Sequence, residues 1–476
     1  MTPPALRDAD GPLLERLTEA LGPGGVTAPD PRYLSEPRGR WHGRAAAVLK
    51  PDTVAAVAAA VRLCAEARVG IVPYAGGTGL VGGQILEAGP VPVVLSVERL
   101  NRIRAVEVTD NVITAEAGAI LADVHAAAEA AGRFFPLSLA SEGSARIGGL
   151  LGTNAGGLNV LRYGNARDLC LGVEAVMADG SVHHGLSCLM KDNMGYDLRH
   201  LLIGSEGTLG LITAASLRLH PAPAETATAW MLVASPEAAL ALLALARERL
   251  GAALNAFELM HVEGMRFLAE TMPQVRLPAP MGTDWAVLAE VSDGAGSEVA
   301  ARFTGLLADA LEAGVAEDGL LAQSEAQRQS FWRVRESIPE ANRHVGSISS
   351  HDVSVPPSRI AEFIARGPAA IAALDPSLRI NCFGHLGDGN LHYNVFPPRG
   401  RHRDEFDSLR GAVKAAIHDL VHELGGSVGA EHGVGRLKVE DLERYGDPAK
   451  LAAMRRIKAA LDPLGILNPG AVISGG

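Results

Sequence analysis

The sequence predicts an α+β protein with at least two domains, and three observations support this prediction. The chain has 476 residues, whereas one domain typically has about 150. Glycine-dense blocks alternate with short apolar strands up to residue 221. Beyond it, apolar strands alternate with Ala- and Leu-rich helical stretches, as in α+β domains. We expect an N-terminal extension over 1–40, a first domain over 41–221, a second domain over 222–405 and a C-terminal helical segment over 406–476.

Local signals predict the elements of the first half. Leu13, Leu14 and Leu17 indicate a short helix. Asp52-Thr53 begins a second helix, in which apolar residues recur at helical spacing. A third helix is expected over 121–131, and the expected strands are 69–72, 91–97, 106–108, 112–115 and 215–219.

The second half is predicted in the same way. The apolar run at 238–246 is far shorter than the ~20 residues that span a bilayer, so it indicates a buried helix. Strands are expected over 230–233 and 285–291, and helices over 237–250 and 298–313. Two further strands, 379–383 and 391–396, flank the turn sequence Gly387-Asp-Gly-Asn390 and predict a β-hairpin.

The composition excludes several classes of function. With 43 Lys+Arg against 54 Asp+Glu, the net charge is −11, which argues against nucleic acid or an anionic membrane as the partner. Aromatic residues make up 4%, too few for the stacking platforms that bind single-stranded nucleic acid. No signal peptide, transmembrane run or Cys-x-x-Cys pair is visible. We therefore expect a cytoplasmic protein with four buried free thiols: Cys64, Cys170, Cys188 and Cys382.

Three glycine-dense blocks predict a ligand-binding domain. In the first, Gly77-Thr-Gly79-Leu-Val-Gly82 fits the Gly-x-Gly-x-x-Gly template of a dinucleotide-binding turn. A glycine and two prolines in 84–92 prevent a following helix, so a nest of backbone N–H groups for a pyrophosphate is favoured over that turn or a mobile loop. The second block, 141–157, and the third, 202–213, also contain apolar residues, which indicates close backbone packing. Three such blocks fit a two-headed cofactor with a pyrophosphate in its middle.

The predicted hairpin brings His385 and His392 together. Asn394 lies two residues beyond His392 and points to the same face. Two imidazoles and a nearby acid, for which Glu431 is the candidate, are three of the ligands that a divalent metal ion prefers. From the hairpin alone, two incidental histidines remain the alternative.

Five motifs in order along the chain resemble those of one enzyme family. They are Pro73-Tyr-Ala-Gly-Gly-Thr-Gly-Leu80, Thr153-Asn-Ala-Gly-Gly157, Gly204-Ser-Glu-Gly-Thr-Leu-Gly210, Gly384-His-Leu-Gly-Asp-Gly-Asn-Leu-His392 and Glu431-His-Gly-Val-Gly435. Over about residues 40–470, the chain is similar to FAD-linked D-2-hydroxyacid dehydrogenases of the vanillyl-alcohol oxidase/p-cresol methylhydroxylase (VAO/PCMH) type. That group includes D-lactate, D-2-hydroxyglutarate and glycolate dehydrogenases. The resemblance implies a VAO/PCMH-type FAD-binding domain made of the first half and the C-terminal segment, with an α+β cap domain over the flavin.

The resemblance also implies how FAD is held. The first block would bind the pyrophosphate, the second would flank the flavin ring and ribityl chain, and the third would lie near the adenosine half. The C-terminal segment would return to the flavin edge. The implied residues are Tyr74, Ala75, Gly76, Gly77, Thr78, Gly79, Leu80, Pro136, Gly143, Ser144, Gly149, Asn154, Gly157, Glu206, Gly207, Ile212 and Asn468.

The family's metal site corresponds to His385, His392 and Glu431, and the resemblance implies zinc there, or else manganese or cobalt. Adjacent side chains usually diverge, so His432 would face the substrate while Glu431 faces the metal. The family's base is at the position of His432, and an imidazole titrates near neutral pH. The metal would polarise the substrate alcohol, and flavin N5 would accept the hydride.

Arg335 matches the family's arginine for the substrate carboxylate, which a planar guanidinium binds through two hydrogen bonds. Asn394 completes the expected catalytic set, whereas Arg333 is expected on the surface. The chain departs from 2-hydroxyglutarate enzymes at Pro339, where they tend to carry threonine, and at Ser350, where they often carry lysine. Those side chains help to hold a distal carboxylate. The residues that could compensate are Asn342, Arg343 and His351.

The substrate is therefore predicted as a small D-2-hydroxyacid, with D-2-hydroxyglutarate, D-lactate and a longer apolar D-hydroxyacid all open. Two alternatives are a flavin subunit of a multi-protein glycolate-oxidising complex and a same-fold flavin alcohol oxidase, which needs no metal. The electron acceptor can be an electron-transfer flavoprotein, a quinone or a cytochrome. A homodimer is compatible with the sequence.

Overall fold

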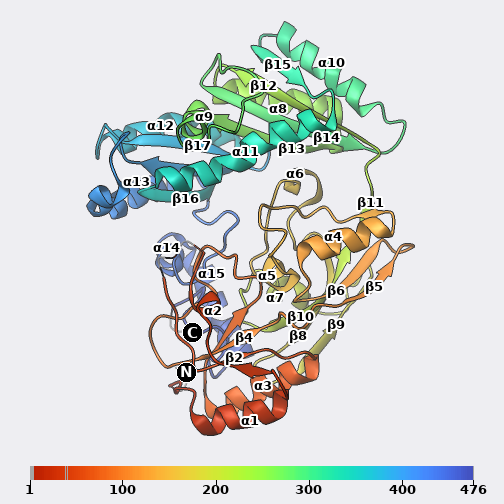
Figure 1. Ribbon diagram of the computed structural model, residues 1–476, viewed down its shortest axis with the longest axis vertical. Helices are drawn as coiled ribbons and strands as arrows, with labels where there is room; N and C mark the ends of the chain where they lie inside the picture. The colour runs from red at the N-terminus through yellow and green to blue at the C-terminus, as the bar shows by residue number, and fades with distance from the viewer. Residues whose placement is uncertain (1–4, 38, 40, 475–476) are drawn as a thin grey trace. The chain divides into compact units, whose positions relative to one another are not determined.

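The computed structural model describes residues 5–37, 39 and 41–474, which form two compact units (Figure 1). The first unit contains the described residues of 1–157, 164–222 and 431–476, and the second contains 158–163 and 223–430. The longer of the two segments of the second unit begins at residue 223, whereas the sequence predicts that the second domain begins at residue 222. That unit continues to residue 430, beyond the predicted boundary at 405. The described residues of the predicted N-terminal extension, 5–37 and 39, belong to the first unit.

The first unit contains three sheets. Their strand orders are β1-β2-β4-β3, β5-β6-β10-β8-β9 and β11-β7. The strands are β1 (Val26–Thr27), β2 (Val48–Leu49), β3 (Ile71–Tyr74), β4 (Val93–Ser96), β5 (Ile103–Glu107), β6 (Val112–Glu116), β7 (Arg133–Phe134), β8 (Cys170–Val176), β9 (Val182–Gly185), β10 (Leu211–Arg218) and β11 (His220–Pro221). The helices are α1 (Gly11–Leu21), α2 (Pro31–Leu34), α3 (Val54–Ala67), α4 (Leu121–Ala130), α5 (Ile147–Gly152), α7 (Leu198–Leu202), α14 (Val439–Tyr445) and α15 (Pro448–Leu461).

Helix α3 begins after Thr53, as predicted, because the Thr53 hydroxyl accepts a hydrogen bond from the N–H of Ala56 at 3.2 Å. Helices α1 and α3 share a hydrophobic core with β3 and β4. Strands β3 and β4 are parallel, and the first glycine block joins them without a helix, as the prolines of 84–92 predict. This connection leaves the backbone of the glycine block available at the end of β3.

The second unit is built on one seven-stranded antiparallel sheet of order β15-β12-β14-β13-β17-β18-β16. Its strands are β12 (Glu225–Val233), β13 (Leu254–His261), β14 (Trp285–Asp293), β15 (Asp318–Leu321), β16 (Ser349–Ser354), β17 (Arg379–His385) and β18 (Asn390–Phe396). Its helices are α6 (Val160–Tyr163), α8 (Pro236–Leu250), α9 (Val262–Thr271), α10 (Val299–Glu312), α11 (Glu325–Val345), α12 (Ile360–Ala372) and α13 (Arg410–Glu423).

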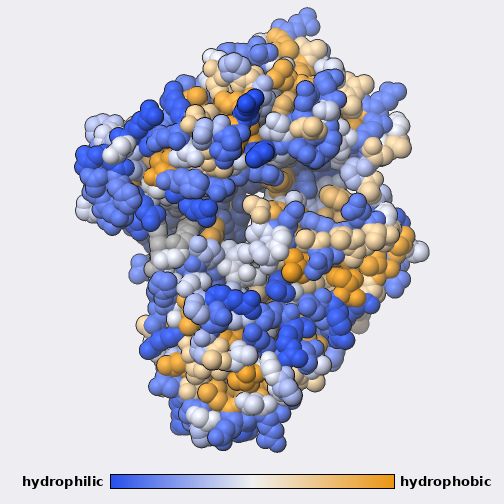
Figure 2. Space-filling model, in the orientation of Figure 1, coloured by the Kyte–Doolittle hydropathy of each residue, from blue (hydrophilic) through white to orange (hydrophobic). Residues whose placement is uncertain are grey.

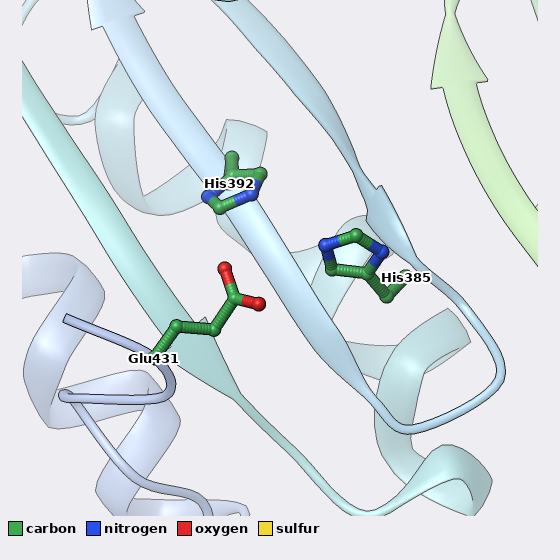
Figure 3. A group of neighbouring side chains, drawn as sticks. All are labelled: His385, His392 and Glu431. Atoms are coloured by element: carbon green, nitrogen blue, oxygen red, sulfur yellow. The ribbon is translucent and has the colours of Figure 1, made fainter. Parts of the chain in front are cut away.

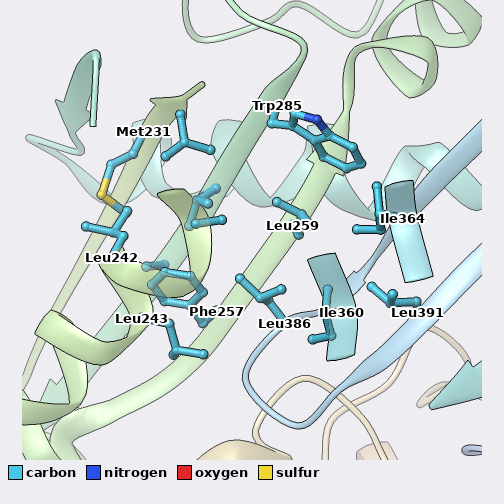
Figure 4. Close-up of a cluster of buried hydrophobic side chains, with 14 of the residues drawn as sticks. Met231, Leu242, Leu243, Phe257, Leu259, Trp285, Ile360, Ile364, Leu386 and Leu391 are labelled. Atoms are coloured by element: carbon cyan, nitrogen blue, oxygen red, sulfur yellow. The ribbon is translucent and has the colours of Figure 1, made fainter. Parts of the chain in front are cut away.

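Each face of this sheet has its own hydrophobic core. Helices α8, α10, α12 and α13 cover one face, where side chains such as Phe257, Leu259 and Leu391 are buried (Figure 4). Helices α9 and α11 cover part of the other face, where Met260 and Phe383 are buried. Alternation along the strands therefore places the residues next to Phe257 and Leu259, including Glu258, on the α9–α11 face.

Three of the four cysteines are buried, as predicted, and burial raises the pKa of Cys64, Cys170 and Cys382 to about 12. The prediction is wrong for Cys188, which is exposed because it lies in the loop between β9 and α7. Hydrophilic residues predominate on the visible surface of both units (Figure 2). Within the described part of the chain, no helix is long and apolar enough to cross a membrane.

Candidate cofactor and active site

The first two glycine blocks are in direct backbone contact. A Cβ atom added to Gly76 would lie 2.5 Å from the carbonyl oxygen of Ser144 and 3.0 Å from Cα of Ala145. A side chain at position 76 would therefore push the two loops apart, so glycine is required here for close approach. This contact agrees with the close backbone packing that the glycine density predicts.

The C-terminal segment joins the first and third blocks. The Glu206 carboxylate accepts hydrogen bonds from the N–H groups of Val434 at 2.7 Å and Gly435 at 2.8 Å. The Asn468 amide donates to the carbonyl oxygens of Glu206 at 2.8 Å and Gly83 at 3.0 Å. Burial raises the pKa of Glu206, although the two N–H groups oppose this shift.

Arg436 completes this junction. Its guanidinium donates to the carbonyl oxygen of Gly83 at 2.9 Å and to Oδ1 of Asn468 at 2.7 Å. Burial lowers the pKa of Arg436 to about 10, while the nearby Glu206 opposes the shift. The carboxylate of Glu206, an expected FAD residue, therefore has a structural role within the first unit.

Three residues expected to bind FAD have backbone conformations that are rare for residues other than glycine. The φ angles of Asn154, Glu206 and Asn468 are 52°, 51° and 45°. Left-handed conformations of this kind cost free energy and cluster at ligand-binding sites. The strain lies in the second block, the third block and the C-terminal segment, which are the regions that the resemblance assigns to the cofactor.

Most of the other expected FAD residues occupy loops or strand ends of the same unit, whereas Gly149 lies within helix α5. Tyr74 ends β3, and its hydroxyl donates to the carbonyl oxygen of Arg32 at 2.9 Å. Ile212 is buried near the start of β10, just before a bulge in the pairing with β8. Partly buried loop residues are Ala75, Gly76, Gly77, Thr78, Gly79, Leu80 and Gly157, whereas Gly143 and Ser144 are exposed.

The histidine hairpin forms as predicted, from β17 and β18. Phe383 pairs with His392, and His385 pairs with Asn390, so both histidines lie on the α9–α11 face of the sheet. Their ring centres are 6.0 Å apart. Asn394 points to this face as well, and its Oδ1 accepts a hydrogen bond from the N–H of His351 at 3.2 Å.

Glu258 is a further buried residue of this site, and our sequence analysis missed it. Strand β13 pairs with β17 so that Glu258 lies opposite His385. The Nδ1 atom of His385 is 2.5 Å from Oε1 of Glu258, and Nε of Arg335 donates to Oε2 at 2.6 Å. Burial raises the pKa of Glu258, but His385 and Arg335 outweigh it and lower the pKa to about 2. A lone acidic residue in the apolar stretch 254–260 is the signal that could have identified it.

Arg335 is buried, whereas Arg333 is exposed, as predicted. The guanidinium carbon of Arg335 lies 4.9 Å from the ring centre of Phe383. Its two terminal nitrogens donate no hydrogen bond to any residue that the structure describes. These nitrogens are suited to bind a carboxylate.

Glu431 is the junction residue between the units, since it is bonded to Ala430, the last residue of the second. The N–H of Ala430 donates to the carbonyl oxygen of Asp352 in β16 at 3.4 Å. Figure 3 shows the Glu431 carboxylate with His385 and His392, and the three ligand atoms lie within 4.8 Å of one another. This donor set fits a divalent metal ion.

A second group of possible ligands overlaps the first. Atoms of Asp352, Glu431 and His432 also lie within 4.8 Å of one another. The side chains of Glu431 and His432 therefore do not diverge as the sequence argument expects. The physical reason is that the chain bends at residues 430–432, whereas divergence of adjacent side chains holds for an extended strand.

The two departures from the 2-hydroxyglutarate pattern are both exposed. Pro339 lies on the exposed side of α11, and the hydroxyl of Ser350 is 2.6 Å from that of Ser347. Of the three compensating candidates, only Asn342 is on the buried side of α11, and it accepts a hydrogen bond from Asn381 at 2.9 Å. Arg343 is exposed. His351 faces the other side of the sheet, with its ring centre 5.2 Å from that of His418.

Two family models match the chain. The FAD binding domain matches residues 45–185, and the C-terminal domain of FAD linked oxidases matches residues 222–472. Among the relatives, mitochondrial D-2-hydroxyglutarate dehydrogenase of Arabidopsis thaliana is 34% identical over 438 residues, which are 91% of this chain and 76% of the relative. The Bos taurus enzyme of the same name is 36% identical, covering 95% and 81%. D-2-hydroxyglutarate dehydrogenase of Xanthomonas citri pv. viticola is 36% identical, covering 90% and 90%.

Solved structures confirm the predicted fold class. A p-cresol methylhydroxylase with substrate bound is 16% identical, with a TM-score of 0.77 and coverage of 98% of both chains. An alkyldihydroxyacetonephosphate synthase is 15% identical, with a TM-score of 0.74 and coverage of 98% of this chain and 85% of that one. The VAO/PCMH fold is therefore shared across this low sequence identity.

Proposed function

This chain belongs to the FAD-linked oxidase family and is an FAD-dependent oxidoreductase, and on that premise we propose that it oxidises a small D-2-hydroxyacid to the 2-oxoacid. The observation that carries the proposal is a side-chain array on one face of the second unit's sheet, in which His385 and Arg335 are buried and His392 is partly buried. The array combines His385 and His392 with Arg335, whose terminal nitrogens bind no described residue. A 2-hydroxyacid presents a hydroxyl next to a carboxylate, which are the two groups such an array can hold.

Both cofactors fit residues of this chain. The closely packed glycine loops and the strained residues Asn154, Glu206 and Asn468 form the cradle that we assign to FAD. His385, His392 and Glu431 would hold a divalent ion, with zinc the first candidate. When bound, FAD supplies a hydride acceptor and the ion supplies a Lewis acid.

The residues of the chain then have distinct roles. The terminal nitrogens of Arg335 would bind the substrate carboxylate, because the contact with Phe383 and the bond to Glu258 hold the guanidinium plane. His432 would accept the hydroxyl proton on a ring nitrogen. Asn394 would orient the substrate from the same face as His392.

D-2-hydroxyglutarate is the first substrate to test, because the curated relatives carry its name. Pro339 and Ser350 do not provide the two side chains that the family resemblance assigns to the distal carboxylate. D-lactate and longer apolar D-2-hydroxyacids therefore belong in the same panel. The glycolate-oxidising complex is the second candidate. Turnover by the purified single chain with an artificial electron acceptor would exclude it.

Substitution of Arg335 tests the proposed substrate site. Arg335→Lys keeps the positive charge but loses the planar pair of donors, so kcat/KM for the best D-2-hydroxyacid should fall about 10–100-fold, as expected for a lost hydrogen bond to a charged group. The matched control is Arg328→Lys, because Arg328 lies two turns earlier on α11 and pairs with Glu290 at 2.8 Å. Steady-state kinetics at equal FAD content should show the loss in the first variant and not in the control. An equal loss in both variants would contradict the assignment.

A further inference from the structure

The carboxylate of Glu258 joins two groups that the proposed function assigns to different tasks. One oxygen is bonded to His385 of β17, a proposed metal ligand, and the other to Arg335 of α11, the proposed carboxylate-binding residue. We propose that Glu258 is a positioning residue that orients both the metal-binding nitrogen of His385 and the carboxylate-binding end of Arg335. This inference rests on the proposed function and adds a residue to it.

The burial of Glu258 requires an explanation. Its side chain is 1% exposed, and its neighbours Phe257 and Leu259 are in the core on the opposite face of the sheet. A buried carboxylate is costly unless charged partners and hydrogen bonds compensate for the lost water. His385 and Arg335 are the partners that provide this compensation.

The bond to His385 determines which ring nitrogen can bind a metal. An ionised carboxylate can only accept hydrogen bonds, so Nδ1 of His385 must carry the proton at this contact. In the neutral ring, Nε2 then keeps its lone pair, which is the form that ligates a metal ion. In Figure 3, one ring nitrogen of His385 is directed toward His392 and Glu431, and the other points away from them.

The bond to Arg335 has a parallel effect on the guanidinium. Because Nε alone donates to Glu258, the two terminal nitrogens keep their N–H groups for a substrate. Phe383 contacts the guanidinium at 4.9 Å and restricts its rotation. The Glu258 carboxylate thus orients both the imidazole of His385 on β17 and the guanidinium of Arg335 on α11.

Glu290 offers a matched control on the same sheet face. It is buried on β14 and accepts hydrogen bonds from Arg328 of α11 at 2.8 and 3.0 Å and from Trp332 at 2.6 Å. Like Glu258, it fastens α11 to the sheet through an arginine. Its hydrogen bonds involve neither a histidine nor a proposed ligand, so its loss should affect packing without affecting the metal.

The experiment compares Glu258→Gln with Glu290→Gln in the FAD-loaded protein. We expect the affinity for Co²⁺, measured by competition with a chelator, to fall about 10–100-fold in Glu258→Gln only, as when an outer-shell partner of a metal ligand is lost. The visible absorption of the Co²⁺ form should change in that variant, and KM for the best D-2-hydroxyacid should rise. Equal Co²⁺ affinities and KM values in the two variants would overturn the inference while leaving the proposed function intact.

A second measurement tests the same role in the wild-type protein and does not depend on the folding of Glu258→Gln. In metal-free wild-type protein with ¹⁵N-labelled histidine, NMR should show His385 as the Nδ1–H tautomer, assigned by comparison with His385→Gln. The Nε2–H tautomer would overturn the positioning role. If wild-type protein binds no Co²⁺ at all, the proposed metal site fails, and the role of Glu258 in metal binding fails with it.

Discussion

His432 is the residue whose chemical role can be separated most clearly from binding. If it accepts the hydroxyl proton, His432→Ala should slow anaerobic reduction of the flavin by roughly 10²–10⁴-fold, the usual contribution of a general base. KM should change little, because the carboxylate contacts of Arg335 remain. Stopped-flow absorbance with the metal content measured in the same sample tests this expectation.

His344→Ala is the control, because this histidine lies on α11 with a side chain that is 43% exposed. Loss of the metal from the variant would change the assignment of His432 as the base. Because Asp352, Glu431 and His432 form an alternative ligand group, loss of the metal from His432→Ala would identify His432 as a ligand. In that case the base must be another residue.

Among the elements, β6 carries a buried carboxylate whose protonation contributes to the pH dependence of stability of the first unit. Glu116 is fully buried and accepts hydrogen bonds from the backbone N–H of Arg102 at 2.9 Å and from Nε of Arg104 at 3.1 Å. Burial raises the pKa of Glu116, but the two arginines outweigh it, so the pKa lies below its ordinary value. A carboxyl group whose pKa is lowered on folding stabilises the folded protein at pH values above the ordinary carboxyl pKa. This stabilisation is lost as the pH falls from the ordinary pKa through the lowered one.

We therefore predict that Glu116→Gln lowers the free energy of unfolding at pH 7 by about 1.5–3 kcal/mol, the range for hydrogen bonds to a charged group. The difference in the free energy of unfolding between wild type and variant should narrow as the pH falls below about 4.3. The wild-type carboxylate then becomes protonated and loses its charge-assisted hydrogen bonds. Urea denaturation at pH 7 and pH 4 measures both values. Glu107→Gln, at an exposed position of β5, is the control and should behave like wild type. A difference that is constant with pH would contradict the account.

Much of the element structure could be predicted because its signals are local. Thr53 caps α3, the prolines of 84–92 exclude a helix, and the turn at 387–390 sets the register of the hairpin. Glu258 could not be predicted as a partner of His385, because 127 residues separate them and only the pairing of β13 with β17 joins them. Strand order depends on tertiary packing, which local patterns do not determine.

At the scale of the whole molecule, tertiary contacts also determine two unit boundaries that sequence patterns did not locate. Residues 158–163 are surrounded in sequence by the first unit yet belong to the second, where Arg162 donates to Asn255 at 3.0 Å. Helix α13 joins the second unit because its apolar side shares a core with β16 and α12. Neither contact has a signature in its own stretch of sequence.

The division into units also predicts how the cofactors dissociate. His385 and His392 are in the second unit, and Glu431 directly follows it in the chain, whereas all three glycine blocks are in the first unit. Chelation should therefore abolish turnover and leave FAD bound. Flavin absorbance after gel filtration, together with metal analysis, measures the two losses separately. Full turnover by a demonstrably metal-free sample would exclude a catalytic metal, and joint loss of FAD and metal would show that the two sites depend on each other.

The most direct test of the central proposal is anaerobic reduction of the bound flavin by a panel of hydroxyacids. The account predicts that one D-2-hydroxyacid among 2-hydroxyglutarate, lactate and longer apolar homologues bleaches the flavin absorbance with one equivalent of substrate. Its L-enantiomer should leave the absorbance unchanged. A flavin that dithionite reduces but that none of the D-2-hydroxyacids reduces, in protein with its full metal content, would contradict the proposed function.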